Sequence, residues 1–312
     1  MSGLHVVLGA GGGLGRAIAA EAASRGLPVR AVNRGGDVDL PGVAAVAADV
    51  ETADGAARAV NDAGVVYMAA QPPYHEWPGR FPGMLRTVVD ATAAAGARLV
   101  MVDNLYGYGP DAGPMSEAGP ERATDAKGRT RREMTGLLLA ADREGRLPVL
   151  IGRLSDYFGP HGDNSTVSAL AVIPGAAGKP IRWPGSLDAP HSVAYLPDAA
   201  RAFVTLAATP SAWRRIWVLP HAPAVTGGEI LGMVNRALPR PVKTARLGMG
   251  LLRLAAPFHR PSREILGIGY QFTAPFVADD AAFRQAFPEF AVTPLDRAMA
   301  ETVAWYRSRL AA

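Results

Sequence analysis

The sequence of 312 residues is long enough for one large domain or two smaller ones with a substantial core. Hydrophobic residues make up 49% of the chain and charged residues 19%, and the formal net charge is only +4, which is typical of a soluble globular protein. Lys and Arg are scattered, so the composition does not support a nucleic-acid partner. The chain has no cysteine, which excludes disulfides, thiolate nucleophiles and Cys-ligated metals.

Neither a signal peptide nor a membrane span is visible in the sequence. The N-terminus enters a strand pattern at once, and no apolar run approaches the roughly 18 residues of a membrane-spanning helix. The 6 histidines are spread without metal-ligand spacing, so we expect no metal site. The sequence therefore predicts a cytoplasmic protein that acts on a small-molecule substrate and binds neither nucleic acid nor membrane.

The first half of the chain alternates short apolar runs with helical patterns. Such alternation predicts right-handed βαβ crossovers and a parallel sheet covered on both faces. The predicted strands are His5–Leu8, Pro28–Val32, Val43–Ala47, Val65–Ala69, Arg98–Val102 and Pro148–Leu154. The predicted helices between them are Leu14–Arg25, Thr52–Asp62, Met84–Ala95 and Gly128–Glu144.

The second half has little periodicity at first and then becomes mostly helical. A helix is predicted over Pro197–Ala208, a strand over Trp213–Leu219 and a closing helix over Pro294–Leu310. We therefore expect an α/β fold, a doubly wound parallel sheet of the Rossmann type with a smaller, mostly helical C-terminal substrate lid. The predicted domains are a Rossmann domain of residues 1–170, which also receives about 196–220, and a lid of residues 171–195 and 221–312.

A glycine-rich turn after the first strand is the most informative motif. Gly9, Gly12 and Gly15 are spaced three apart between an apolar strand and an Ala-rich helix. In a dinucleotide site one such glycine allows the tight turn, one lets the backbone approach the pyrophosphate, and one lets helix and strand pack closely. Gly13 and Leu14 begin the helix, whose N-terminal amides and dipole would stabilise the phosphate charge.

The end of the second strand distinguishes NADP from NAD. An acidic residue there would accept hydrogen bonds from the ribose 2′-hydroxyl of NAD. This sequence has Asn33 and Arg34 instead, and Arg34 can form charge-assisted hydrogen bonds with a 2′-phosphate. The predicted cofactor is therefore NADP(H).

Several segments, taken in order, resemble the extended short-chain dehydrogenase/reductase superfamily, the group often labelled NAD-dependent epimerase/dehydratase. Besides the Gly-x-x-Gly-x-x-Gly turn they include residues 153–160, His191–Ala202 and Thr302–Tyr306, so the resemblance runs nearly the whole length of the chain. It implies an enzyme with a nicotinamide cofactor. The further cofactor contacts that it implies come from Asp49, Val50, Ala69, Ala70, Gln71, Lys127 and Leu154.

The catalytic positions depart from this family. Its enzymes carry Ser or Thr before a Tyr-Gly at the end of the fifth strand, and then Tyr-x-x-x-Lys on the next helix. Aligned on Tyr108 and the glycine after it, the Ser position falls on Asn104, Lys127 replaces the Tyr and Arg131 replaces the Lys. In one interpretation Lys127 and Asn104 polarise a substrate oxygen, Arg131 stays near the cofactor ribose, and Tyr106 or Tyr108 supplies the proton.

Three functions remain open from the sequence. The favoured one is an NADP(H)-dependent oxidoreductase acting on a small polar carbonyl or alcohol. The second is a redox-neutral epimerase, isomerase or dehydratase with tightly bound cofactor, and the third is a non-catalytic regulator that senses NADP(H).

Two further features of the sequence leave their roles open. Tyr74, His75 and Trp77, after the fourth strand, either line a substrate pocket or pack the loop. The resemblance also implies a homodimer formed through the helices on either side of the active site. An apolar stripe that suits either this contact or packing on the sheet consists of Met134, Leu137, Leu138 and Ala141.

Overall fold

The computed structural model describes residues 3–311, except for the side chains of residues 260 and 261. Its contacts group the chain into two compact units. The first unit comprises the chain up to Gly107, Ala123–Leu154 and Ala199–Leu219, and the second comprises Tyr108–Arg122, Ser155–Asp198 and the chain from Pro220 onward. The division into domains that the sequence suggests, with its border after residue 170, stays a prediction.

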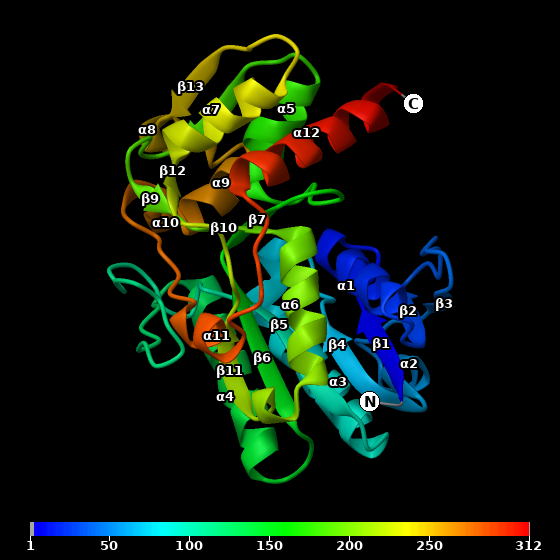
Figure 1. The fold of residues 1–312 in the computed structure, drawn as a ribbon. Coiled ribbons are helices and arrows are strands. Elements are labelled where there is room, and N and C mark those ends of the chain that lie inside the picture. Colours follow the sequence, from blue (N-terminus) through cyan, green and yellow to red (C-terminus); the bar gives the residue numbers. More distant parts are fainter. Residues whose placement is uncertain (1–2, 312) are drawn as a thin grey trace. The chain divides into compact units, whose positions relative to one another are not determined.

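A seven-stranded sheet forms the centre of the first unit. Its strand order is β11-β6-β5-β4-β1-β2-β3, and every neighbouring pair is parallel (Figure 1). The order reverses at β1, which pairs with both β2 and β4, and ligands of such sheets bind at the carboxyl ends of the strands around this point. The predicted doubly wound fold is confirmed. The strands are β1 (Leu4–Leu8), β2 (Val29–Asn33), β3 (Ala44–Ala47), β4 (Ala63–Met68), β5 (Arg98–Asn104), β6 (Val149–Leu154) and β11 (Arg215–Val218).

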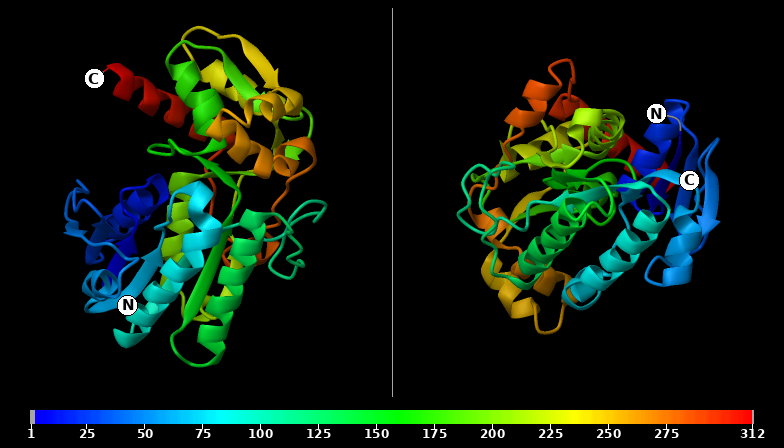
Figure 2. Two further views of the ribbon diagram at one scale, coloured as in Figure 1. Left: turned by 180° about the vertical axis from the view of Figure 1, so that it is seen from behind. Right: turned by 90° about the horizontal axis from the view of Figure 1, so that it is seen from below.

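Helices cover both faces of this sheet. Across one face α3 and α4 lie side by side, with α2 packed next to α3 (Figure 2). On the other face α1 and α6 are joined where the Arg25 guanidinium donates to the Thr205 hydroxyl at 3.2 Å. Gly152 of β6 lies against α6, because a Cβ there would come within 2.3 Å of the Phe203 ring. The helices are α1 (Gly13–Ser24), α2 (Ala53–Val60), α3 (Trp77–Ala94), α4 (Ala126–Arg143) and α6 (Leu196–Ala208).

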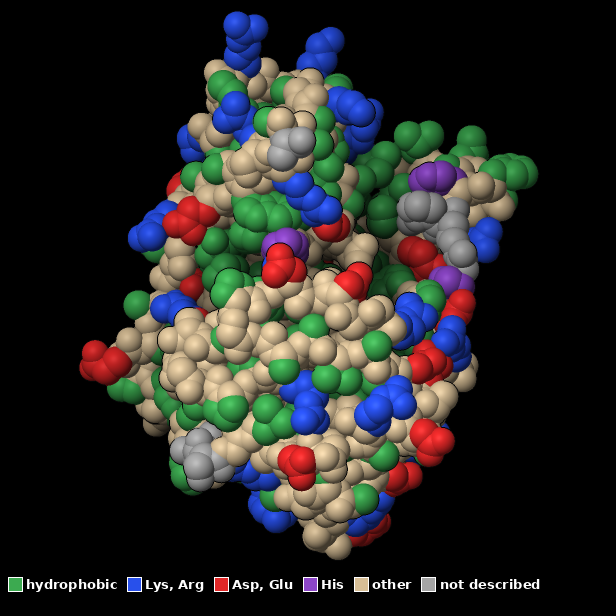
Figure 3. Space-filling view, turned by 90° about the vertical axis from the view of Figure 1, so that its right-hand side faces the viewer, with side chains coloured by type: hydrophobic (Ala, Val, Ile, Leu, Met, Phe, Trp, Pro, Cys, Tyr) green, Lys and Arg blue, Asp and Glu red, His purple; other side chains and the backbone are tan. Residues whose placement is uncertain are grey.

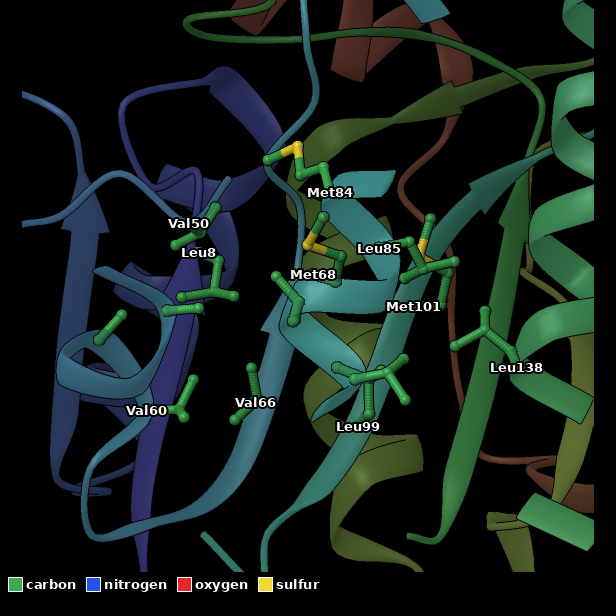
Figure 4. Close-up of a cluster of buried hydrophobic side chains, with 14 of the residues drawn as sticks. Leu8, Val50, Val60, Val66, Met68, Met84, Leu85, Leu99, Met101 and Leu138 are labelled. Carbon is green, nitrogen blue, oxygen red and sulfur yellow. The ribbon is translucent and has the colours of Figure 1, made fainter. Parts of the chain in front are cut away.

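The core between the sheet and α2, α3 and α4 is built from alternate strand residues and one stripe of each helix (Figure 4). Burying each large aliphatic side chain there stabilises the fold by about 1.5–3 kcal/mol. The apolar stripe of α4 packs into this core, with Met134, Leu138 and Ala141 buried and Leu137 against them. The strand side chains of this core include Leu8, Val66, Met68, Leu99 and Met101.

The start of α3 differs from the sequence prediction. The helix begins at Trp77, whereas the sequence predicts its start at Met84. Pro78 and Pro82 suggest a loop, but Pro78 lies in the first turn, where a helix needs no N–H donor. Pro82 lies inside the helix and is buried. Tertiary packing therefore extends α3 over a segment whose local sequence disfavours it.

The second unit combines short strand pairs with helices, and the predicted helical C-terminal region is present. Three two-stranded ladders join β7 (Asp156–Phe158) to β10 (Val193–Tyr195), β8 (Ile181–Pro184) to β13 (Thr244–Leu247), and β9 (Pro190–His191) to β12 (Val225–Thr226). The sequence analysis predicts none of these strands, which lie in the part of the chain with little periodicity. The longer helices are α7 (Gly227–Ala237), α8 (Met249–Ala255), α9 (Arg260–Gly267) and α12 (Leu295–Ala311), and the short ones are η2 (Ser168–Val172), α5 (Ile173–Ala176), α10 (Tyr270–Thr273) and α11 (Ala281–Ala286).

None of the helices in residues 3–311 is long and apolar enough to cross a membrane.

Candidate functional site

The turn between β1 and α1 has a shape that only glycine allows at two positions. Gly9 has a φ of +85°, and a Cβ there would lie 2.5 Å from the Cα of Ala70, just after β4. A Cβ on Gly15 would lie 2.4 Å from the carbonyl oxygen of Gly9. The glycines therefore let α1 and the end of β4 pack directly on the turn.

The N-terminus of α1 has the properties of a phosphate cradle. Gly12 is its N-cap, no described side chain caps its amides, and its first turn, which starts at Gly13 and Leu14, holds no acid. A Cβ on Gly12 would meet only the Gly9 carbonyl oxygen, at 3.5 Å, so the backbone here is open to a ligand. Amides and the helix dipole stabilise a phosphate at such a terminus. The residues present therefore fit the pyrophosphate of a dinucleotide.

Hydrogen bonds of polar side chains hold a tight loop of the chain at the end of β2. The Oδ1 of Asn33 accepts a hydrogen bond from the Gly36 N–H at 2.6 Å, and its Nδ2 donates to the Asp37 carboxylate at 2.7 Å. Arg34 is exposed next to them. Sequence reasoning missed Asp37. The chain turns back at Gly36, which has a φ of +67°, and so brings Asp37 to the end of the strand. Opposite charges therefore flank the strand end where Rossmann folds bind the adenosine ribose.

The remaining predicted adenine and backbone contacts lie at the carboxyl ends of β3 and β4. Val50 is buried in the core, whereas Asp49 is exposed and its Oδ1 accepts the Glu51 N–H at 3.0 Å. The Ala69 N–H donates to the Leu8 carbonyl at 3.0 Å and extends the β4–β1 ladder. Ala70 and Gln71 then leave the sheet beside the glycine turn. Their part in cofactor binding stays a prediction.

Three predicted site residues meet where β5 ends and α4 begins. The Oδ1 of Asn104 accepts the Tyr106 N–H at 3.0 Å. A Cβ on Gly128 would lie 2.6 Å from the Tyr106 carbonyl oxygen, so α4 starts directly against this backbone. Lys127 is only 9% exposed, and its Nζ lies 4.0 Å from the centre of the Tyr74 ring. A cation–π contact thus holds the Lys127 ammonium group over the Tyr74 ring at the start of α4.

Arg131 belongs to a buried ion cluster. Its Nη1 lies 3.3 Å from Oδ1 of Asp103, and the Nε of Arg153 lies 3.1 Å from Oδ2 of the same carboxylate. Burial lowers the pKa of Arg131, and the Asp103 carboxylate opposes this effect. The guanidinium also lies 4.2 Å from the centre of the Trp77 ring. Two buried guanidinium groups therefore share the Asp103 carboxylate at the end of β5.

The aromatic residues after β4 pack around these cations. The Trp77 ring meets the Tyr74 ring edge-on at 4.7 Å between centroids, and its Nε1 donates to the Pro72 carbonyl at 3.2 Å. The Tyr106 ring lies 6.2 Å from the Trp77 ring. Sequence reasoning left open whether Tyr74 and Trp77 line a pocket or pack the loop, and the structure shows that they pack against Lys127 and Arg131.

The remaining predicted residues are Tyr108 and Leu154, and Leu154 pairs with Asn104 across β6 and β5. Tyr108 belongs to the second unit, where it is buried and its hydroxyl donates to the Ser116 carbonyl at 2.6 Å. Leu154 is buried at the end of β6. The predicted catalytic role of Tyr108 and the predicted cofactor contact of Leu154 stay predictions.

A doubly wound parallel sheet with a glycine cradle at β1 defines a dinucleotide-binding Rossmann protein. Residues 5–219 match the profile of the NAD dependent epimerase/dehydratase family, and the chain belongs to this family. It is therefore an enzyme of the extended short-chain dehydrogenase/reductase type with a nicotinamide dinucleotide cofactor. The family and enzyme class predicted from the sequence are confirmed.

Solved structures share this fold over nearly the whole chain. MoeE5 in complex with UDP-glucose and NAD is 23% identical, with 99% of each chain covered and a TM-score of 0.76. The UDP-glucose 4-epimerase of Thermus thermophilus in complex with NAD is 16% identical, with 97% of this chain and 99% of that chain covered and a TM-score of 0.77. DesIV, a dTDP-glucose 4,6-dehydratase from Streptomyces venezuelae, is 18% identical, with coverages of 99% and 98% and a TM-score of 0.79. No curated protein matches the sequence significantly.

Proposed function

We propose that this enzyme catalyses a redox-neutral epimerisation or dehydration of a sugar carried on a nucleoside diphosphate. Family membership supports the class of reaction. The substrate class is supported by structures of the same fold that hold UDP-glucose or UDP-glucuronic acid together with NAD. The sensing regulator that the sequence left open lacks comparable support.

The cluster of Asn104, Tyr106 and Lys127 is the observation that carries this proposal. It lies at the carboxyl end of β5, on the sheet edge where Rossmann enzymes bind their ligands. The buried ammonium of Lys127 and the neighbouring guanidinium groups of Arg131 and Arg153 favour negative charge on a nearby substrate oxygen. Such charge develops when a sugar hydroxyl loses its proton during oxidation.

The proposed roles follow from the donors that each side chain offers. Because the Oδ1 of Asn104 is taken by the Tyr106 N–H, the Nδ2 group is the side that donates to a substrate oxygen. Lys127 stabilises the same oxygen by charge, and the Tyr106 phenol carries the proton. The bound nicotinamide dinucleotide supplies reversible hydride transfer. The positions of Arg131 and Arg153 are fixed by Asp103, so both act through their charge.

We infer NADP(H) rather than NAD as the cofactor. The exposed Arg34 guanidinium at the end of β2 is suited to a 2′-phosphate. The nearby Asp37 carboxylate would repel that phosphate. A hydrogen bond from Asn33 Nδ2 holds this carboxylate within the loop. Arg34 is therefore the group that selects the cofactor in this proposal.

An assay that measures both the sugar product and the amount of reduced cofactor tests the reaction class. The enzyme is incubated with NADP⁺ or NAD⁺ and with UDP-glucose or dTDP-glucose, and products are followed by NMR while absorbance reports the reduced nicotinamide. We expect an epimer or a dehydrated sugar without net cofactor reduction. A net oxidoreductase, the function that the sequence favours, would instead change the cofactor in proportion to product when offered small polar carbonyls or alcohols. That result would overturn the proposal.

A further inference from the structure

An exposed apolar stripe projects from the second unit at α8 and the turn after it. The exposed fractions are 63% for Leu251, 78% for Leu254 and 93% for Phe258. Leu251 and Leu254, three residues apart, lie on one side of α8, and Phe258 follows in the turn after the helix, while Leu252 is buried and attaches the helix to its unit. Figure 3 shows hydrophobic side chains that project from the surface at the upper right, next to a histidine.

The chain around this stripe is strongly basic. Residues 239–263 contain six Lys and Arg and no Asp or Glu. Lys243, Arg246 and Arg253 are exposed, and none of them forms an ion pair within the described part of the chain. The apolar stripe is therefore surrounded by positive charge that no carboxylate of its own segment neutralises.

These charges decide which occupant fits the stripe. A second copy of the chain would bring the same cations to a symmetric contact, and like charges at an interface oppose association. Phe258 is almost fully exposed, so no groove of this unit surrounds it, and a projecting side chain of this kind enters a deformable lipid layer readily. Anionic phospholipids supply both the negative charge and the apolar layer.

We propose that this stripe docks the enzyme on a membrane surface that contains anionic phospholipid. Leu251, Leu254 and Phe258 enter the apolar layer, and the neighbouring cations contact headgroup phosphates. The sequence predicts no membrane partner because it lacks a spanning helix, but a peripheral contact needs none. This inference goes beyond the proposed reaction and does not depend on it.

Co-sedimentation of the full chain with vesicles tests this docking. Vesicles of phosphatidylcholine alone are compared with vesicles that also contain phosphatidylglycerol. We expect binding to the anionic vesicles alone, weakened by salt, since each basic residue near the surface contributes about fivefold to the affinity. The double variant Leu254→Ser/Phe258→Ser should lower that binding at least about tenfold. Leu310→Ser is the matched control, because Leu310 is 57% exposed on α12 and outside the basic segment.

Three results would overturn the proposal. The first is a wild-type chain that fails to bind the anionic vesicles, and the second is an equal loss of binding in the Leu310→Ser control. The third is a lipid-free oligomer, seen by analytical ultracentrifugation, that the double variant dissociates, since a second copy would then occupy the stripe. Thermal unfolding of each variant verifies folding, which exposed positions should leave unchanged.

Discussion

Asp103 compensates two buried guanidinium groups at the end of β5. Replacing it by Asn removes the carboxylate charge that pairs with both Arg131 and Arg153. We expect Asp103→Asn to lower the free energy of unfolding by about 3–5 kcal/mol, measured in urea. Asp296→Asn is the control, because this exposed carboxylate pairs with Arg236 at the surface and should contribute less than about 1 kcal/mol. Equal effects of the two variants would show that the buried cluster is not compensated by Asp103.

Arg34 and Asp37 have opposite expected effects on the choice of cofactor. Arg34→Ala should weaken NADP binding about ten- to hundredfold, since one charge-assisted contact is lost, and should leave NAD binding nearly unchanged. Asp37→Asn removes a charge that repels the 2′-phosphate and should strengthen NADP binding. Isothermal titration of both cofactors measures these changes. Equal affinity of the wild type for NAD and NADP would refute the assignment of NADP.

Kinetic measurements can distinguish two roles of Lys127, one at the substrate oxygen and one in cofactor binding. If Lys127 stabilises the substrate oxygen, Lys127→Met should lower kcat by roughly a hundredfold or more and leave NADPH binding intact. Weaker NADPH binding with an unchanged rate in the bound state would instead assign Lys127 to the cofactor. Arg129→Met provides the control, since Arg129 is an exposed cation two residues further along the same helix.

At the scale of single elements, the glycines of the β1–α1 turn differ in how much room they leave for a side chain. Gly9→Ala strains a residue with a φ of +85° and pushes a methyl group into the Ala70 backbone, so we expect loss of stability and of cofactor binding together. Gly12→Ala meets only one oxygen at 3.5 Å and should leave the thermal midpoint nearly unchanged. Because its methyl group fills the phosphate cradle, NADPH affinity should still fall. Unchanged NADPH affinity in Gly12→Ala would place the pyrophosphate elsewhere.

The elements differ in how far the sequence predicts them. The strands of the large sheet were predicted because a buried parallel strand is a short apolar run between turn residues. The start of α3 was missed because its prolines disfavour a helix in the local sequence, whereas tertiary packing stabilises one. The Asp103 cluster was missed because its partners lie 28 and 50 residues away in the sequence, and no local pattern joins them. Asp37 was missed because no sequence pattern shows that the chain after its two preceding glycines turns back to Asn33.

At the scale of the whole molecule, buried phenols govern stability at alkaline pH. Burial, and then Asp156, raise the pKa of Tyr157 to about 12, and burial also raises the pKa values of Tyr67, Tyr195 and Tyr306. An unfolded tyrosine ionises near pH 10. The stabilisation by the neutral Tyr157 phenol is therefore full below pH 10 and is lost as the pH rises from 10 to about 12.

Urea unfolding at a series of alkaline pH values tests this dependence. Between pH 10 and 12 the free energy of unfolding should fall for the wild type. It should fall less steeply for Tyr157→Phe, which has no proton to lose. The same steepness in both would show that Tyr157 ionises at an ordinary pH.

The packing of Arg131 also bears on the redesign of this enzyme. Arg131→Lys, one step toward the family's Tyr-x-x-x-Lys pair, would remove a planar cation from Trp77 and weaken its bond to Asp103. Lys127→Tyr, the other step, would crowd a second ring onto Tyr74. Each single change is therefore expected to lower the stability of the protein. The altered positions are thus coupled through their packing, and a designer who wants the common chemistry back should replace Lys127 and Arg131 together with the side chains that contact them.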